Sequence, residues 1–331
     1  MEAFMKLLIM APNYQEYEAE IRAIIPDWQI VALDEKPETE LLRKAIADAD
    51  VVFGQPSYQD LKAAKKLRWL QMQWAGVDCY AKAPYFPENV ILTNVSGAYG
   101  DVIAEHALAL TLALARHLRR YNHQQDECCW QDCGSEKFLG GSTALILGVG
   151  DLGSQCARRF KALGLKTIGI ATHIRKLACF DEIHTLAELV KLLPKADVLV
   201  GCLPDTAKTQ GLLDFAKLTK MKDDAILINV GRGSLIEEAD LEKLLAQGKF
   251  WGVGLDVFAK EPLSPASSLW HRDNVIITPH VAGIAFGHAK SAEQSVYRIF
   301  IDNLKRFVAN EQLHNIVDLQ AGYAVKKHEE L

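Results

Sequence analysis

The sequence predicts an α/β protein with two domains, one of which contains a doubly wound parallel sheet. The chain has 331 residues, which is more than a single hydrophobic core usually serves. Short apolar runs alternate with helical patterns along most of the chain, and this alternation is typical of parallel sheets with helical crossovers. Near the middle, residues 143–160 join one apolar run to a helical pattern through a glycine-rich turn.

The N-terminal part contains several short strands with helices between them. We expect strands at 6–10, 28–33, 51–53, 67–74 and 91–95, and helices at 17–25 and 38–47. Ligands of open α/β sheets collect beyond the carboxyl ends of the strands, so the turns at 54–57 and 74–78 are candidate substrate contacts. Because Gly and Pro impose turns by themselves, ordinary turn structure explains both segments equally well on pattern alone.

One helix, expected from Val102 to Arg120 behind an Asp101 cap, is apolar almost all round. Such a helix is buried on more than one side, either at the centre of its domain or against a second subunit. The charged residues that flank the apolar run leave it too short to span a membrane.

The polar segment at 121–139 contains Cys128, Cys129 and Cys133. A metal site needs further ligands, and no second group of cysteines or histidines with zinc-like spacing accompanies these three. We therefore expect an exposed arm or loop here, and no metal.

The glycine-rich turn has the spacing of a dinucleotide-binding fingerprint. The strand at 143–147 ends in a G-x-G-x-x-G sequence, and a helical pattern follows. Gly148 permits a tight turn, Gly150 leaves no Cβ between the backbone and a pyrophosphate, and Gly153 allows the helix to pack close to the strand. Free N–H groups at the start of the helix then face the anion. The alternative is a turn without a ligand, and the second strand at 166–171 argues against it.

The same alternation continues to the C-terminal helix. Strands are expected at 166–171, 197–203, 225–230, 252–257 and 275–278, and helices at 186–193, 215–220 and 238–247. A last helix has an apolar stripe formed by Val296, Ile299, Phe300, Leu304 and Phe307. We expect this helix to return to the first domain, and the charged end at 326–331 to be frayed.

Composition excludes several classes of function. The formal charge of -5 and the pI of about 6.1 provide no basic surface for nucleic acid. No stretch approaches the roughly 18 apolar residues of a membrane span, and residues 1–10 lack the pattern of a secretory signal. The seven cysteines are odd in number and scattered, which indicates reduced thiols in a cytoplasmic protein.

The second strand of the nucleotide-binding unit ends without the carboxylate that would bind a ribose 2′-hydroxyl. Ala171, Thr172 and His173 stand there instead, followed by Arg175 and Lys176. A missing carboxylate removes repulsion toward a 2′-phosphate, and a nearby cation with Thr and His donors can bind one. This favours NADP over NAD. The alternative is a relaxed NAD site beside surface charges.

Three later segments carry polar residues at strand ends of the same sheet, and they contribute Arg232, Glu261 and His280. An arginine offers a planar fork to a carboxylate, and a histidine titrates near neutral pH. A carboxylate beside the histidine fixes its tautomer. From spacing alone, a structural Arg–Glu pair and a helix-capping histidine are as plausible as a catalytic group.

Taken together, these segments resemble the D-isomer-specific 2-hydroxyacid dehydrogenases, a family that includes formate, D-glycerate, phosphoglycerate and glyoxylate/hydroxypyruvate enzymes. The motifs that carry the resemblance lie at 147–153, 229–233, 255–262 and 278–283. The resemblance implies a flavodoxin-like substrate domain made of 1–97 and 287–331, and a Rossmann-type cofactor domain at 98–286. It also implies a homodimer formed through the cofactor domains.

The resemblance further implies a role for each motif residue. His280 would protonate the carbonyl oxygen, Glu261 would keep a proton available on it, and Arg232 would hold the substrate carboxylate. Backbone amides of Ala75, Gly76 and Val77, together with Arg232 and His280, would contact the substrate. The residues expected to contact the cofactor are Gly148, Gly150, Asp151, Leu152, Gly153, Thr172, His173, Arg175, Cys202, Leu203, Pro204, Val230, Gly231, Arg232, Asp256, His280 and Gly283.

Three hypotheses for the function follow. The first is an NADPH-preferring reductase that converts a short 2-keto acid, such as glyoxylate or hydroxypyruvate, to the D-2-hydroxy acid; NAD(H) remains a possible cofactor. The second is an NAD-dependent enzyme that oxidises a D-2-hydroxy acid, as phosphoglycerate enzymes do. The third is a nucleotide-sensing binding protein of the corepressor type. The absence of a cation from 54–57 mildly disfavours a phosphorylated substrate.

Overall fold

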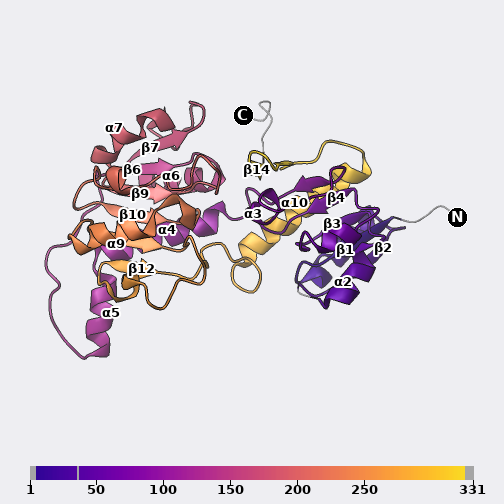
Figure 1. The fold of residues 1–331 in the computed structure, drawn as a ribbon, viewed down its shortest axis with the longest axis horizontal. Helices are drawn as coiled ribbons and strands as arrows, with labels where there is room; N and C mark the ends of the chain where they lie inside the picture. The colour runs from indigo at the N-terminus through magenta and orange to yellow at the C-terminus, as the bar shows by residue number, and fades with distance from the viewer. Residues whose placement is uncertain (1–4, 36, 325–331) are drawn as a thin grey trace. The chain divides into compact units, whose positions relative to one another are not determined.

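The chain folds into two compact units, each with its own parallel sheet (Figure 1). The first comprises Met1–Tyr99 and Ile284–Leu331, and the second comprises Gly100–Gly283. The structure is a computed structural model that describes residues 5–35 and 37–324, so the charged end at 326–331 lies outside the described residues. Within the described part of the chain, no helix is both long enough and apolar enough to cross a membrane.

The sheet of the first unit has the strand order β2-β1-β3-β4-β5, and all its pairs are parallel. Its strands are β1 (Lys6–Ile9), β2 (Gln29–Ala32), β3 (Val51–Phe53), β4 (Trp69–Gln71) and β5 (Ile91–Thr93). The helices between them are α1 (Glu18–Ile24), α2 (Thr39–Ile46) and α3 (Asp78–Ala81). This order is that of flavodoxin-like sheets. The strand predicted at 67–74 is shorter than expected.

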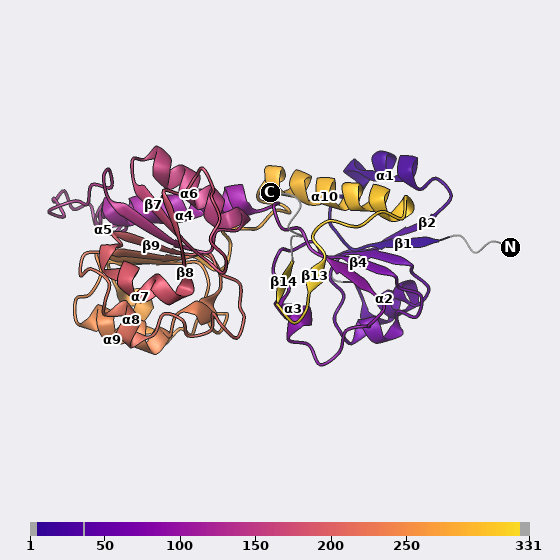
Figure 2. The ribbon, with the colours of Figure 1, turned by 90° about the horizontal axis from the view of Figure 1, so that it is seen from above.

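The long helix α10 (Lys290–Val308) belongs to the first unit, as its apolar stripe predicts. It lies beside α1 on one face of the sheet, and α2 lies on the other face (Figure 2). Phe300 stacks on Phe53 of β3 with 4.1 Å between ring centroids. Asn303, which is fully buried, donates a hydrogen bond to Gln71 Oε1 at 3.0 Å. A hairpin of β13 (Val317–Asp318) and β14 (Tyr323–Ala324) follows.

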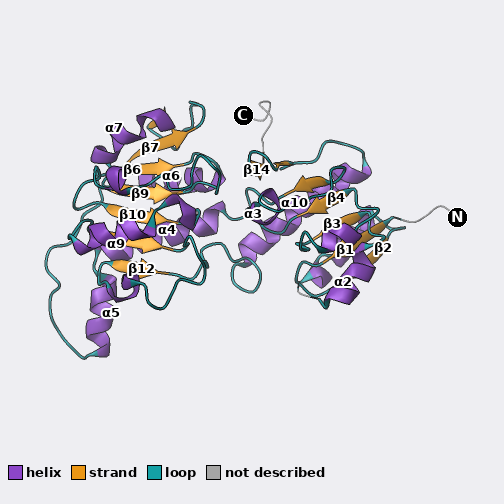
Figure 3. Cartoon of the chain, viewed as in Figure 1, coloured by secondary structure: helices purple, strands orange, loops and turns teal. Residues whose placement is uncertain are grey.

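The second unit has a parallel sheet in the order β12-β11-β10-β9-β6-β7-β8 (Figure 3). The order in which the chain adds strands changes direction between β6 and β9, although all strands are parallel. Its strands are β6 (Thr143–Leu147), β7 (Lys166–Ala171), β8 (Glu182–Thr185), β9 (Val198–Gly201), β10 (Ile226–Asn229), β11 (Gly252–Leu255) and β12 (Val275–Ile277). Strand β8 is absent from the sequence prediction. All four of its residues are only partly buried, so it lacks the apolar run that marks the other strands.

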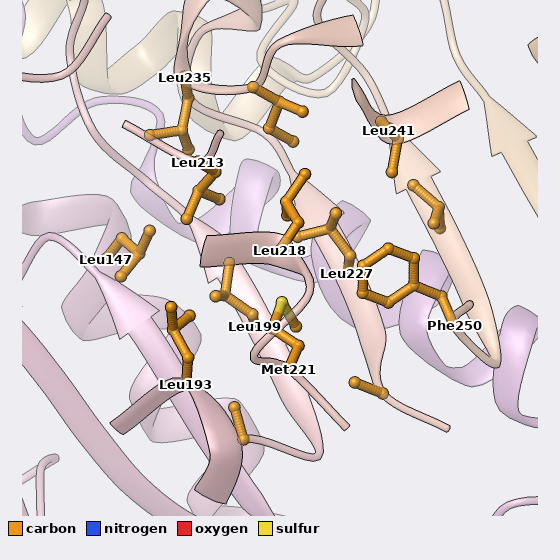
Figure 4. Close-up of a cluster of buried hydrophobic side chains, with 14 of the residues drawn as sticks. Leu147, Leu193, Leu199, Leu213, Leu218, Met221, Leu227, Leu235, Leu241 and Phe250 are labelled. Carbon is orange, nitrogen blue, oxygen red and sulfur yellow. The ribbon is translucent and has the colours of Figure 1, made fainter. Parts of the chain in front are cut away.

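Helices cover both faces of this sheet, which makes it doubly wound as predicted. On one face, α4 (Gly100–Ala115) and α6 (Asp151–Ala162) contribute side chains to a shared apolar core. On the other face, α7 (Leu189–Leu192), α8 (Phe215–Leu218) and α9 (Glu238–Ala246) pack over a second core (Figure 4). In that core, Leu199 and Leu227 of the strands meet Leu218 of α8.

The single helix predicted from Val102 to Arg120 is wrong. The structure has two helices, α4 and α5 (Leu118–Asp126), because His117 takes a left-handed conformation with φ of 53° between them. Helix α4 also begins before the expected Asp101 cap. Part of the segment predicted as a loop is therefore helical. One face of α4 is buried on the sheet, whereas Leu112 on another face is 38% exposed.

Candidate active site

The glycine-rich turn packs so closely that it excludes side chains at two positions. Gly148 has a φ of +102°, and its N–H donates to the Ile170 carbonyl oxygen of β7 at 2.9 Å. A Cβ on Gly153 would lie 1.8 Å from the Gly148 carbonyl oxygen. Helix α6 begins at Asp151, with Gly150 as its N-cap. The first-turn N–H groups of α6 therefore start directly at the turn, where an anion binds favourably.

Gly150 differs from the other two glycines of the turn, because a Cβ placed on Gly150 would meet no atom within 4 Å. The space over Gly150 is thus open, whereas the space over Gly153 is filled by backbone. An open position beside a helix N-terminus fits a pyrophosphate.

The ends of β6, β9 and β10 pack on one another beside this turn. A Cβ on Gly148 would lie 3.0 Å from the Cys202 carbonyl oxygen, and a Cβ on Gly231 would lie 2.8 Å from the Leu203 carbonyl oxygen. The Pro204 carbonyl oxygen accepts a hydrogen bond from Thr209 Oγ1 at 2.6 Å. The strand ends therefore form one continuous rim, and Val230 is buried behind it.

Cys202 is a poor candidate for chemistry of its own. Its Sγ lies 3.9 Å from Cys156 Sγ of α6. Contact with that thiol, together with burial, raises the pKa of Cys202 well above its ordinary value. A thiol in this state is not a nucleophile, since reactivity requires the thiolate.

In the loop after β7, the predicted cofactor residues differ in their exposure and in their contacts. Thr172 and His173 are exposed. The Arg175 guanidinium instead donates from Nη2 to the Val149 carbonyl oxygen of the glycine-rich turn at 2.8 Å. Arg175 Nε is buried and has no hydrogen-bond partner among the described residues. A buried N–H donor without a partner is costly, and an anionic ligand would relieve this cost.

The structure brings His280 and Glu261 together. His280 Nδ1 and Glu261 Oε2 are 2.7 Å apart, and Glu261 Oε1 accepts a hydrogen bond from the Phe258 N–H at 3.0 Å. The His280 side chain is 47% exposed and that of Glu261 is 36% exposed. The carboxylate is thus anchored on one side and orients the imidazole on the other, which leaves Nε2 to meet a ligand.

Asp256, at the end of β11, organises the turn that carries His280. Its side chain is almost fully buried. The carboxylate accepts hydrogen bonds from the N–H groups of Val281 at 3.0 Å and Ala282 at 3.1 Å. The Asp256 carbonyl oxygen accepts from the His280 N–H at 2.8 Å. The same residue therefore fixes the backbone at His280 and at the two positions after it, just before Gly283.

Arg232 follows β10 in a segment that is fixed through its backbone. Asn229 Nδ2 donates to the Arg232 carbonyl oxygen at 2.9 Å, and Arg232 Nη1 donates to the Gly231 carbonyl oxygen at 2.8 Å. A Cβ on Gly233 would lie 1.8 Å from the Phe258 carbonyl carbon. The segment of Arg232 therefore packs directly on the segment that leads to Glu261.

The turn formed by Ala75, Gly76 and Val77 belongs to the first unit. Asn94 Nδ2 donates to the Ala75 carbonyl oxygen at 2.7 Å, which fixes the turn. Among the described residues, none of the three turn N–H groups donates a hydrogen bond to the protein. Three adjacent N–H groups of this kind suit an anionic ligand such as a carboxylate.

One polar residue of the second unit, on the helix before the glycine-rich turn, escapes the sequence prediction. His106 lies on α4, and its Nε2 is 2.9 Å from Thr278 Oγ1. A single histidine in an apolar helix gives no sequence signal, since it resembles an ordinary core residue.

Within the described ranges, no group of three His, Cys, Asp or Glu side chains is arranged to hold a metal ion.

A doubly wound sheet with this glycine-rich turn, and a paired histidine and carboxylate at neighbouring strand ends, defines an NAD(P)-dependent oxidoreductase. Residues 108–282 match the family model described as D-isomer specific 2-hydroxyacid dehydrogenase, NAD binding domain. The chain belongs to this family, whose members act on the CH–OH group of D-2-hydroxy acids. The family resemblance and the fold class predicted from the sequence are confirmed.

Similar proteins match nearly the whole chain. The glycerate dehydrogenase of Methylorubrum extorquens is 30% identical over 319 residues, with 92% of each chain covered. The D-3-phosphoglycerate dehydrogenase of Archaeoglobus fulgidus is 29% identical, and the match spans 95% of this chain but only 59% of that relative.

Two solved structures extend the comparison. A D-isomer specific 2-hydroxyacid dehydrogenase family protein from Aeromonas salmonicida is 34% identical with a TM-score of 0.85, covering 96% of this chain and 100% of that one. The NADPH-dependent glyoxylate/hydroxypyruvate reductase from Sinorhizobium meliloti, in complex with NADP and sulfate, is 29% identical with a TM-score of 0.82 and the same coverage.

Proposed function

We propose that this protein reduces a short 2-keto acid, such as glyoxylate or hydroxypyruvate, to the D-2-hydroxy acid and prefers NADPH to NADH. The observation that carries the proposal is the 2.7 Å contact between His280 Nδ1 and Glu261 Oε2 in the unit that contains the glycine-rich turn. Such a pair supplies a proton at a fixed place, which a carbonyl oxygen needs during reduction.

In this proposal a cofactor domain at about 98–286, which contains the second unit, binds the cofactor. The fingerprint residues fit a dinucleotide, because Gly150 is open and the first turn of α6 starts beside it. The other contacts come from the rim of strand ends, and NADPH supplies the hydride when it is bound. A substrate domain at about 1–97 and 287–331, which forms most of the first unit, provides the substrate turn.

The protein side chains perform three tasks. His280 donates a proton from Nε2 to the carbonyl oxygen, while Glu261 holds Nδ1 and keeps the ring oriented. Arg232 binds the substrate carboxylate through its guanidinium fork. The backbone N–H groups of residues 75–77 also bind a carboxylate. They are available for it because they donate no hydrogen bond to the described residues.

Three observations support NADPH as the preferred cofactor. No carboxylate follows β7 at residues 171–173, so nothing there repels a 2′-phosphate. Arg175 lies against the glycine-rich turn and retains a buried N–H without a partner in the described part of the chain. The Sinorhizobium meliloti relative binds NADP.

We also propose a homodimer formed through the second units. In a single chain, α4 and the segment after it expose Leu112, Leu118, Trp130 and Phe138, with Trp130 at 103% relative exposure. Apolar surface of this extent favours a partner surface.

All seven cysteines are free thiols, which suits a cytoplasmic protein.

The test is the oxidation of NADPH and of NADH, followed by absorbance, with glyoxylate, hydroxypyruvate, pyruvate and a branched 2-keto acid at equal concentrations. We expect rapid turnover with NADPH and slow turnover with NADH. Faster turnover with NADH would overturn the cofactor preference but keep the enzyme. No turnover with either cofactor would contradict the proposed function and favour a nucleotide-sensing binding protein.

A further inference from the structure

A histidine on α4 forms a hydrogen-bonded chain with the residue that fixes the His280 turn. His106 Nε2 lies 2.9 Å from Thr278 Oγ1, and Thr278 Oγ1 lies 2.6 Å from Asp256 Oδ1. His106 Nε2 is also 3.7 Å from Asp256 Oδ1. The side chain of His106 is 24% exposed and that of Asp256 is 2% exposed. The chain of contacts is thus largely shielded from water.

The direction of each hydrogen bond in this chain follows from the donors available. A carboxylate only accepts, so Thr278 donates its single hydroxyl proton to Asp256. The Thr278 oxygen has no second proton, so it can only accept the hydrogen bond that it forms with His106. His106 must therefore donate from Nε2, which fixes the proton on that nitrogen of the ring.

The backbone at His280 needs to be held in place. His280 has a φ of 54°, a left-handed conformation that costs free energy in any residue with a Cβ. The Asp256 carbonyl oxygen accepts the His280 N–H, and the Asp256 carboxylate accepts the N–H groups of the next two residues. A rotation of the Asp256 carboxylate would therefore break the bonds to the two N–H groups after His280 and loosen the turn that carries the imidazole.

We infer that His106 is a positioning residue for the reduction: its hydrogen bond to Thr278 holds the Asp256 carboxylate in the rotamer that fixes the His280 turn. This inference rests on the proposed function. It assigns a role in the site to α4. The buried residues near His106 on this helix, Ala104 and Ala107, are apolar core residues. Because His106 acts through two other residues, it acts on the rate of the chemical step more than on cofactor binding.

The test compares His106→Gln, which keeps an amide donor near the position of Nε2, with His106→Leu, which has none. Both variants are assayed with NADPH and the 2-keto acid that the wild type reduces fastest, and NADPH affinity is measured by fluorescence titration. We expect His106→Leu to lower kcat by about tenfold to a hundredfold, with the Kd for NADPH changed by less than about threefold. His106→Gln should restore most of kcat.

A second pair tests the same chain of contacts at its centre. Thr278→Ser keeps the hydroxyl, whereas Thr278→Val removes it with little change in shape. We expect the Ser variant to keep most of kcat and the Val variant to lose it as His106→Leu does. This pair decides the question if His106→Leu does not fold.

Three outcomes would overturn the inference: an unchanged kcat in His106→Leu, an equal loss in His106→Leu and His106→Gln, or an unchanged kcat in Thr278→Val. Failure of the proposed function itself is recognised separately, because the wild type would then show no turnover with any of the keto acids while NADPH binding is still measured.

Discussion

The glycine-rich turn and the loop after β7 are both proposed to contact the cofactor, and they do so by opposite means. In the turn, Gly148 and Gly153 are required by backbone packing, and Gly150 leaves open space. In the loop, Thr172 and His173 are exposed side chains. The comparison teaches that the proposed pyrophosphate site is part of the fold itself. The proposed preference for NADPH depends instead on side chains that the fold does not require.

The largest effect is expected from Gly153→Ala, since its Cβ would lie 1.8 Å from the Gly148 carbonyl oxygen. The helix must move away from the strand, so we expect the free energy of unfolding to fall by roughly 3 kcal/mol and NADPH binding to be lost. Urea denaturation and fluorescence titration measure the two effects. A stable variant that binds NADPH would show that the turn tolerates a side chain.

Gly150→Ala is the matched control for this change, because its Cβ meets no atom within 4 Å. We expect stability within about 0.5 kcal/mol of the wild type, as for substitutions away from packed features. NADPH binding should nevertheless weaken markedly, since the methyl group enters the space assigned to the pyrophosphate. Unchanged NADPH affinity would contradict that assignment.

A smaller and more selective effect is expected from Arg175→Gln. A hydrogen bond to a charged group contributes about 1.5–3 kcal/mol, so kcat/KM with NADPH should fall by roughly tenfold to a hundredfold. The value with NADH should change little, and steady-state kinetics with both cofactors tests this. Lys176→Gln removes the same charge from the next, exposed position and should have little effect. Equal losses with both cofactors would mean that Arg175 acts only through its bond to the Val149 carbonyl oxygen.

The smallest effect concerns His184 of β8, which follows the loop. Its Nε2 lies 2.9 Å from Glu182 Oε2, and its Nδ1 lies 3.2 Å from Glu188 Oε1. The hydrogen bond to Glu182, and then that to Glu188, raises the pKa of His184 above its ordinary value. A raised histidine pKa stabilises the folded state fully below the unfolded pKa of about 6.5, and this stabilisation is lost as the pH rises through the folded pKa.

We therefore expect His184→Gln to lower the free energy of unfolding by a few tenths to about 1 kcal/mol at pH 6, after screening by solvent, and by less at pH 9. Urea denaturation of both proteins at the two pH values measures the difference. An equal destabilisation at both pH values would exclude the charged histidine as its cause.

Much of the fold is predictable from the sequence, because buried parallel strands form apolar runs and the fingerprint glycines mark the turn. Three features are not. Strand β8 is only partly buried, so it has no such run. The break at His117 involves neither Gly nor Pro, so no helix-breaking residue marks it in the sequence. The contact of His106 with Thr278 depends on packing between α4 and the sheet, which no local pattern encodes.

The proposed site shows the same division. The family resemblance implies the pairing of His280 with Glu261, and in the structure the two residues follow the adjacent strands β11 and β12. The bond from Arg175 to the Val149 carbonyl oxygen does not, because it depends on the rotamer of a long side chain.

The most direct test of the proposed chemistry is the rate of NADPH oxidation by His280→Gln with saturating glyoxylate, or with whichever 2-keto acid the wild type reduces fastest. The substitution removes the proton donor, and the glycine-rich turn is unaffected. We predict a loss of kcat of about 10²-fold or more, as for other general acids, with NADPH affinity retained. A variant with the full wild-type rate would contradict the assignment of His280 as the acid.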